Sequence, residues 1–139
     1  MLVLGPGSLF TSTIPALLGC GVRGALAAFD GPVVYVSNVM TQPGETGGFA
    51  VSDHVRAISE HLGPVVTDVL VHRGEFSPDV LARYEAEEAA PVASDLGALR
   101  GMGLRVRAAD VLSRDDRAGV RHDPDRLAEE VCGAALVCL

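Results

Sequence analysis

The stretch Val33-Val34-Tyr35-Val36 decides the fold class, because it is an uninterrupted run of β-branched and aromatic residues. Such a run is typical of a strand that is buried on both faces, as in a parallel sheet covered by helices. Two further strand-like segments follow at residues 66–71 and 104–108, and helical patterns separate them. Strands that alternate with helices indicate βαβ units, so we expect an α/β fold with a mostly parallel sheet and flanking helices.

The other elements are predicted from apolar spacing and from helix start signals. Ser77-Pro78-Asp79 combines an N-cap, a proline at the first helical position and an acid in the first turn, and therefore predicts a helix that runs to about Glu88. The alternating segment 104–108 indicates a half-exposed edge strand. The remaining predictions are one or two short helices within 9–29, a helix over 52–62, a short strand at 91–93, a charged turn at 114–117 and a last helix from about 123.

The first residues of the chain also resemble a strand. Leu2-Val3-Leu4 is apolar and runs directly into Gly5, without a polar segment before it. We interpret it as a central strand, and a domain rarely starts on a central strand. We therefore expect residues 1–139 to be a single α/β unit that forms the C-terminal part of a larger domain.

Composition narrows the function classes. Hydrophobic residues make up 48% of the 139 residues and charged residues 21%, as in a globular protein. The formal charge is −7 without a basic run, which argues against a nucleic-acid partner. No apolar run approaches the roughly 20 residues that span a bilayer, so we expect a cytoplasmic protein. Three cysteines without ligand spacing predict reduced thiols and no metal site. Homo-oligomerisation stays open.

The loop after the first strand has the features of a phosphate-binding loop. Glycines let backbone N–H groups approach a ligand closely, and the following helix start favours negative charge. The spacing is not that of a dinucleotide-binding loop, and no lysine is present to complete a P-loop. A tight turn with a serine N-cap is the alternative. The residues predicted to contact phosphate are Gly5, Gly7, Ser8, Thr11 and Ser12.

A second polar, glycine-rich loop follows the strand at Val33–Val36. Its amide, hydroxyl and carboxylate groups suit the edges of a sugar or a base. Because loops after parallel strands emerge at the same sheet edge, we expect both loops to meet at one site. A well-ordered surface loop is the alternative. The residues predicted to bind ligand here are Asn38, Thr41, Gln42, Gly44, Glu45 and Thr46.

The histidines give weaker signals. His54 and His61 share a helix side, which indicates packing at the boundary of the core more than a metal site. His72 ends a predicted strand and is expected near the edge that carries the two loops. His122 precedes Asp123, whose role as an N-cap is sufficient by itself. No Ser/His/Asp or Cys/His set can be assembled from spacing, so no catalytic residue is assigned.

Four strings together carry a family resemblance. They are Leu4–Ser12, Asn38–Thr46, Ser52–Val55 and Val120–Pro124. With them the chain resembles the bacterial gluconeogenesis-factor branch of the 2-phospho-L-lactate transferase (CofD-like) superfamily. The resemblance implies a Rossmann-like fold, of which this chain matches only the C-terminal two-fifths. His72 and Arg73 depart from the polar, Asn-like residues expected there.

The resemblance implies two functions. The bacterial branch is linked to carbon metabolism and cell shape, and is thought to bind UDP-sugars such as UDP-N-acetylglucosamine. The transferase branch moves a phospholactyl group onto a deazaflavin from a nucleotide-activated donor. The string from Met40 to Thr46 favours the bacterial branch, so we expect a regulatory nucleotide-sugar-binding protein more than an enzyme. The transferase stays the alternative, as does a fragment without a function of its own.

Overall fold

The computed structural model of the chain describes residues 1–113 and 119–136. The predicted charged turn at 114–117 lies outside the described residues. Four strands are present: β1 (Leu2–Leu4), β2 (Val33–Val36), β3 (Asp68–His72) and β4 (Arg105–Ala109). The helical segments are η1 (Leu9–Thr13), α1 (Ile14–Leu17), α2 (Val22–Ala27), α3 (Val51–Leu62), α4 (Pro78–Ala86), α5 (Leu96–Gly101) and α6 (Pro124–Leu136).

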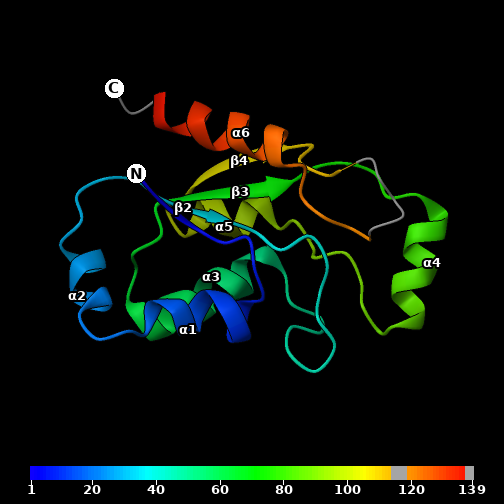
Figure 1. The fold of residues 1–139 in the computed structure, drawn as a ribbon, viewed down its shortest axis with the longest axis horizontal. Helices are drawn as coiled ribbons and strands as arrows, with labels where there is room; N and C mark the ends of the chain where they lie inside the picture. Colours follow the sequence, from blue (N-terminus) through cyan, green and yellow to red (C-terminus); the bar gives the residue numbers. More distant parts are fainter. Residues whose placement is uncertain (114–118, 137–139) are drawn as a thin grey trace.

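The strands form one parallel sheet in the order β1-β2-β3-β4 (Figure 1). The predicted α/β fold with a parallel sheet and flanking helices is confirmed. The prediction for β4, a half-exposed edge strand, is also confirmed. The prediction that β1 is a central strand is wrong for the described sheet, because β1 lies at its other edge with Leu2 and Val3 exposed.

Helices cover both faces of the sheet (Figure 1). The segments η1, α1, α3 and α5 lie on one face, and α6 lies on the other. Along β2, Val33 and Tyr35 belong to the core on the α3 side, whereas Val34 and Val36 pack with Leu127 and Val131 of α6. All four residues of β2 are buried, because both faces of this strand are covered.

Helix α3 buries a broad apolar face against the sheet. It begins where the Asp53 carboxylate accepts a hydrogen bond of 2.8 Å from the Ala50 N–H. His54 is 0% exposed and packs between the rings of Tyr35 and Phe49. The prediction of boundary packing is therefore wrong for His54, whose ring lies inside the core because the chain folds Phe49 over it. His61 is exposed.

Three segments differ from the sequence predictions. Helix α5 was not predicted; it is six residues long and its one buried residue, Leu99, is 0% exposed. Strand β3 begins two residues later than expected. The predicted strand at 91–93 occurs as two isolated bridges, from Met40 to Pro91 and from Ala50 to Ala93. The helix start at Ser77 is confirmed, since its side chain accepts a hydrogen bond from the Val80 N–H.

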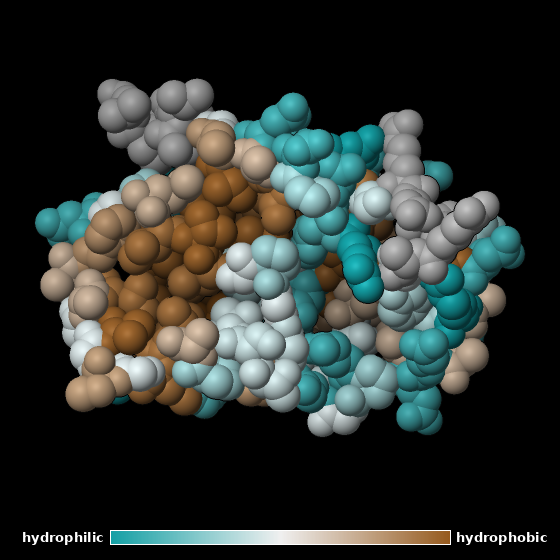
Figure 2. All heavy atoms as spheres, in the orientation of Figure 1, coloured by the Kyte–Doolittle hydropathy of each residue, from teal (hydrophilic) through white to brown (hydrophobic). Residues whose placement is uncertain are grey.

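The surface is divided between apolar and polar regions. Figure 2 shows apolar side chains gathered around the β1 edge, where Met1, Leu2 and Val3 are exposed, and polar side chains toward the opposite end of the sheet. In residues 1–113 and 119–136, none of the helices combines the length and the apolar character that crossing a membrane requires.

Candidate functional site

The loops that follow the strands meet at the carboxyl edge of the sheet. A cleft of about 240 Å³ at this edge brings together segments that are far apart in the sequence. Ligands of parallel α/β sheets bind in such crevices, outside the carboxyl ends of the strands. The cleft is lined by residues of both loops, of α4 and of the segment before α6: Pro6, Gly7, Asn38, Val39, Met40, Thr41, Gln42, Tyr84, Val120 and His122.

The two glycines of the first loop have different roles. Gly5 has a φ of +85°, and a Cβ there would lie 3.1 Å from the carbonyl oxygen of Val36. Only glycine adopts this conformation readily, so Gly5 is required by the turn of the chain against β2. Gly7 lines the cleft, and a Cβ there would lie 3.4 Å from the Cβ of Ser12. A Cβ at Gly7 would therefore point toward η1, and the glycine leaves the backbone of the loop bare where it borders the cleft.

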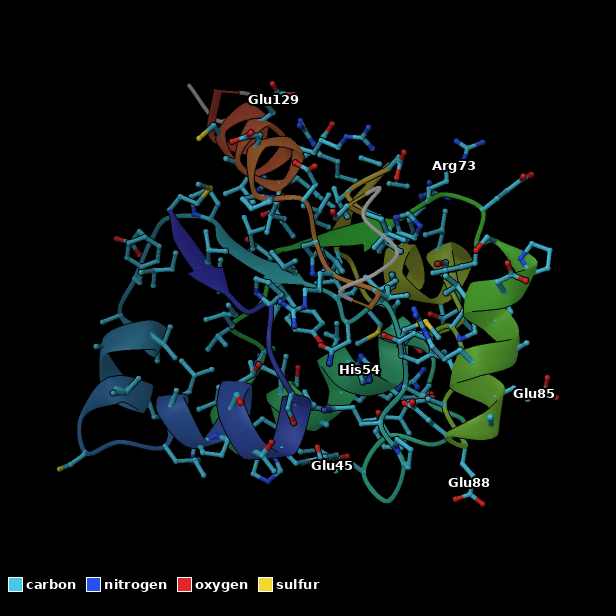
Figure 3. All side chains as sticks on the ribbon, turned by 45° about the vertical axis from the view of Figure 1, so that its right-hand side comes forward. Glu45, His54, Arg73, Glu85, Glu88 and Glu129 are labelled. Carbon is cyan, nitrogen blue, oxygen red and sulfur yellow. The ribbon has the colours of Figure 1, made fainter. Side chains whose placement is uncertain are left out.

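A hydrogen-bond network joins the two loops. The Ser8 hydroxyl donates to Oε2 of Glu45 at 2.8 Å and accepts from the hydroxyl of Thr11. Ser8 also caps η1 by accepting from the Thr11 N–H, so the N-cap interpretation of Ser8 is confirmed. The Glu45 carboxylate thus lies near the start of η1 (Figure 3). There it complements the partial positive charge of the helix start, and it fixes the two loops relative to each other.

The second loop is held rigidly by its threonines. The Thr41 hydroxyl accepts a hydrogen bond from the Ala90 N–H at 2.9 Å, and the Thr41 N–H donates to the Ala90 carbonyl at 2.7 Å. The Thr46 hydroxyl, which is fully buried, accepts from the Gln42 N–H at 2.9 Å. Both threonines therefore shape the backbone from which Asn38 and Gln42 project.

Two buried polar atoms of the cleft lack a partner within the described residues. They are Oε1 of Gln42 and Nε2 of His122. A buried polar atom without a hydrogen bond destabilises the protein by about 1–3 kcal/mol, so native proteins retain few of them. Both residues line the same cleft. The amide oxygen of Gln42 accepts hydrogen bonds, and Nε2 of His122 donates or accepts one according to the tautomer. This arrangement is typical of a site that hydrogen-bonds a ligand.

His122 is a cleft residue that the sequence analysis underrated. Its ring lies within reach of the backbone of Ser37, after the end of β2. Burial lowers the pKa of His122, the neighbouring His72 lowers it further, and the hydrogen bond to Ser37 opposes both effects. His122 is therefore a neutral imidazole near pH 7. The string Val120–Pro124, which contributed to the family resemblance, was the signal that pointed to it.

Tyr84 is the second residue that the sequence analysis missed. It lines the cleft from α4, and its hydroxyl accepts a hydrogen bond of 2.9 Å from the Val120 N–H. This hydrogen bond holds the segment that carries His122 against α4. No local pattern distinguishes Tyr84 from an ordinary helix residue, because its contacts come from segments far along the chain.

The structure brings some of the predicted site residues together and leaves others apart. Gly7, Asn38, Thr41 and Gln42 line the cleft, and Ser8 and Glu45 connect its two loops. Gly5, Gly7 and Ser12 border a second hollow of about 270 Å³ on the β1 side of Pro6. The predicted ligand residues outside the cleft lining are Gly5, Ser8, Thr11, Ser12, Gly44, Glu45 and Thr46.

No cluster of three His, Cys, Asp or Glu side chains suited to a metal ion occurs in residues 1–113 and 119–136. The cleft contains a neutral histidine, an amide and hydroxyl groups, whereas the nearby carboxylate of Glu45 is engaged by Ser8. These groups are suited to hydrogen-bonding a polar ligand.

Comparisons with known proteins identify relatives of this chain. Residues 1–112 match the model of the family described as 2-phospho-L-lactate transferase CofD. The chain is 48% identical over 129 residues to a protein of Deinococcus radiodurans, which covers 92% of this chain and 27% of that protein. It is 41% identical over 133 residues to the gluconeogenesis factor of Halalkalibacterium halodurans, which covers 94% of this chain and 41% of the relative.

A solved structure agrees with these relatives. The crystal structure of a Bacillus halodurans protein superposes with a TM-score of 0.89 at 39% identity, covering 94% of this chain and 42% of that one. The Bacillus subtilis gluconeogenesis factor is 37% identical over 129 residues, covering 92% of this chain and 40% of that protein. The predicted resemblance to gluconeogenesis factors is thus confirmed. The chain spans about two-fifths or less of the length of these relatives.

Proposed function

The chain belongs to the family of the 2-phospho-L-lactate transferase CofD, and from that premise we propose that it forms part of a nucleotide-sugar-binding site in a gluconeogenesis-factor type of protein. The ligand class is that of UDP-N-acetylglucosamine, and the role is regulatory binding in carbon metabolism and cell shape. The observation that carries this proposal is the cleft in which Gln42 and His122 bury unpartnered polar atoms beside both loops.

The chemistry of the cleft supports a phosphorylated, sugar-containing ligand. Gly7 leaves room for a bulky group against the backbone, and Asn38 and Gln42 offer amide groups for hydroxyl or base edges. A net charge of −7 repels an anion at long range, so binding depends on local donors in the cleft. The neutral imidazole of His122 gains a favourable interaction with a phosphate when it takes up a proton.

A transferase that uses a nucleotide-activated donor is the second candidate, and the family model itself favours it. We infer binding without turnover because Glu45, a carboxylate on the loop beside the cleft, accepts a hydrogen bond from Ser8, and because the named relatives are gluconeogenesis factors. A cytoplasmic location fits the free thiols of Cys20 and Cys132, which are exposed. Incubation of the full-length protein with a nucleotide-activated phospholactyl donor and a deazaflavin acceptor, followed by analysis for the released nucleotide, separates the two candidates.

Calorimetric titration of UDP-N-acetylglucosamine into the full-length protein tests the site. We expect Gly7→Val to lower the affinity about tenfold or more, because a branched side chain on this loop hinders close approach of the phosphates to the backbone N–H groups. We expect Gln42→Ala to weaken binding by about 1–3 kcal/mol, because the ligand loses a buried partner. Gly24→Val is the matched control, since a Cβ at Gly24 in α2 meets no atom within 4 Å. Unchanged affinity in both cleft variants, with the fold intact, contradicts the site.

A further inference from the structure

A second pocket lies beside the cleft at the same sheet edge. Its volume is about 350 Å³, and it shares Asn38 and Val39 with the cleft, so one ligand can extend from one into the other. Pockets of this size are at the lower end of the range that binds small organic molecules. The second pocket therefore suits one compact group of a larger ligand.

Two polar side chains in this pocket are almost completely buried and lack partners within the described part of the chain. Ser37 is 1% exposed and its hydroxyl forms no hydrogen bond there. The side chain of His72 is 6% exposed, and neither ring nitrogen has a hydrogen-bond partner. Oδ1 of Asp110 is 3.9 Å from Nδ1 of His72, which is too far for a hydrogen bond, and the Asp110 carboxylate is paired with Arg126.

His72 is held in a fixed position. The ring of Phe76 packs edge-on against it, with centroids 5.4 Å apart. Gly74 lies so close that a Cβ there would be 2.6 Å from Cε1 of His72. Burial lowers the pKa of His72 despite the opposing effect of Asp110, so the imidazole is neutral near pH 7. A neutral imidazole offers one donor and one acceptor, and the Ser37 hydroxyl offers one of each as well.

The mostly apolar walls of the second pocket make it unfavourable for a charged group of a ligand. Eight of its fourteen lining residues are apolar, and Val51, Phe76 and Leu96 are among them. Among the described residues that line this pocket, Arg73 alone carries a charged side chain, and it is exposed and extends away from the sheet edge (Figure 3). A phosphate would find no cation inside, and a sugar with a hydroxyl on most carbons would leave several of them without partners.

We propose that this second pocket binds the base of the nucleotide, a planar and uncharged heteroaromatic ring, with Ser37 and His72 hydrogen-bonding its edge. The apolar walls cover the faces of the ring, and the two buried side chains match donors and acceptors that are close together on one edge. The phosphates then extend past Asn38 and Val39 into the cleft beside Gly7. The proposal rests on the nucleotide-sugar function and adds to it where each end of the ligand lies.

Two probes separate the base from the phosphates. Titrations of uridine diphosphate and of inorganic pyrophosphate are compared in the full-length protein and its Ser37→Ala variant. We expect Ser37→Ala to lower the affinity for uridine diphosphate about fivefold or more and to leave the affinity for pyrophosphate unchanged. Removing an unpartnered hydroxyl does not destabilise the free protein, so folding is not in question. Ser59→Ala, in α3 and away from both pockets, is the matched control.

A second variant and three opposing results complete the test. His72→Leu is expected to lower the affinity for uridine diphosphate in the same way. The melting temperature of this variant shows whether it is folded. Unchanged affinity for uridine diphosphate in Ser37→Ala overturns the base pocket, and so does an equal loss for both probes. If UDP-N-acetylglucosamine and pyrophosphate both fail to bind the unmodified protein, the nucleotide-sugar function itself fails, and the base pocket with it.

Discussion

The core beneath α3 and the carboxyl edge of the sheet both bury side chains, but with different consequences. In the core, Val55, Ile58, Val69 and Leu99 are at most 1% exposed and surround one another with apolar atoms. At the edge, Ser37 and His72 are also buried, at 1% and 8% exposed, yet their polar side-chain atoms lack hydrogen-bond partners in the described residues. Burial of apolar surface stabilises the fold, whereas buried polar atoms without partners reduce its stability. Burial reflects packing among the apolar side chains of the core, whereas the unpartnered polar side chains at the edge belong to residues that line pockets large enough for a ligand group.

The core should show the largest effect on stability. Ile58 is 0% exposed in the middle of α3, so Ile58→Ala leaves a cavity and is expected to cost about 2–5 kcal/mol of the free energy of unfolding. Urea denaturation measures this loss. Leu81→Ala is the control, because Leu81 is 38% exposed on α4 and should lose much less. Equal losses at the two positions would remove the distinction between core and surface.

His54 tests the comparison from inside the core, because it too has unpartnered ring nitrogens. Burial lowers the pKa of His54 below the ordinary value of 6.5. As the pH falls below 6.5, this histidine is therefore protonated in the unfolded chain before it is protonated in the folded chain. Stability is therefore retained above about pH 6.5 and falls as the pH decreases below it, by up to about 1.4 kcal/mol per pH unit for each such histidine. His72 and His122 add to the same slope.

Urea denaturation between pH 5 and 8 checks this sign. His54→Phe, which keeps an aromatic ring between Tyr35 and Phe49, should reduce the slope without removing it. His61→Gln on the exposed side of the same helix is the control, since it leaves the three buried histidines in place. A stability that rises as the pH falls from 7 to 5 would show that the assigned direction is wrong.

Two buried hydroxyls at the edge should give the smallest effects, and the difference between them is informative. Thr46 accepts a hydrogen bond from the Gln42 N–H, so Thr46→Val leaves that donor unpartnered and is expected to cost about 1 kcal/mol. Ser37→Ala removes an atom that has no partner in the described residues, and is expected to change stability by about 0.5 kcal/mol or less. Thermal denaturation of both variants without ligand checks the pair. A larger loss for Ser37→Ala than for Thr46→Val would indicate that the Ser37 hydroxyl has a structural role.

Much of the fold was predictable because its signals are local. The run Val33–Val36 gave a strand buried on both faces, and Ser77 before Pro78 gave a helix start. Helix α5 was missed because six residues with a single buried side chain, Leu99, show no periodicity, and packing against β4 and α3 stabilises the helix instead. The position of His54 was wrong because Phe49, outside the helical pattern, folds over it.

The candidate site was predictable only in part. The two loops were identified because glycine and polar residues directly follow strands, and parallel strands send their loops to one edge. Thr46 was expected at the ligand, but its hydroxyl holds the Gln42 backbone. Tyr84 and His122 reach the cleft from 38 and 76 positions beyond Thr46, and no local spacing connects them with the second loop.

The sequence by itself determined the alternation of strands and helices, the parallel sheet and the sheet edge at which the two loops emerge, since each depends on residues that are neighbours in the chain. Only the tertiary structure decided which polar atoms are left without partners and which pocket each one faces. Whether Ser37, Gln42 or His122 finds a hydrogen-bond partner depends on segments that only folding brings together. The donor–acceptor distance of a hydrogen bond varies by only a few tenths of an ångström, so no sequence pattern predicts it. The family resemblance suggested the proposed class of ligand, and the arrangement of these unpartnered atoms suggested the proposed position of its parts.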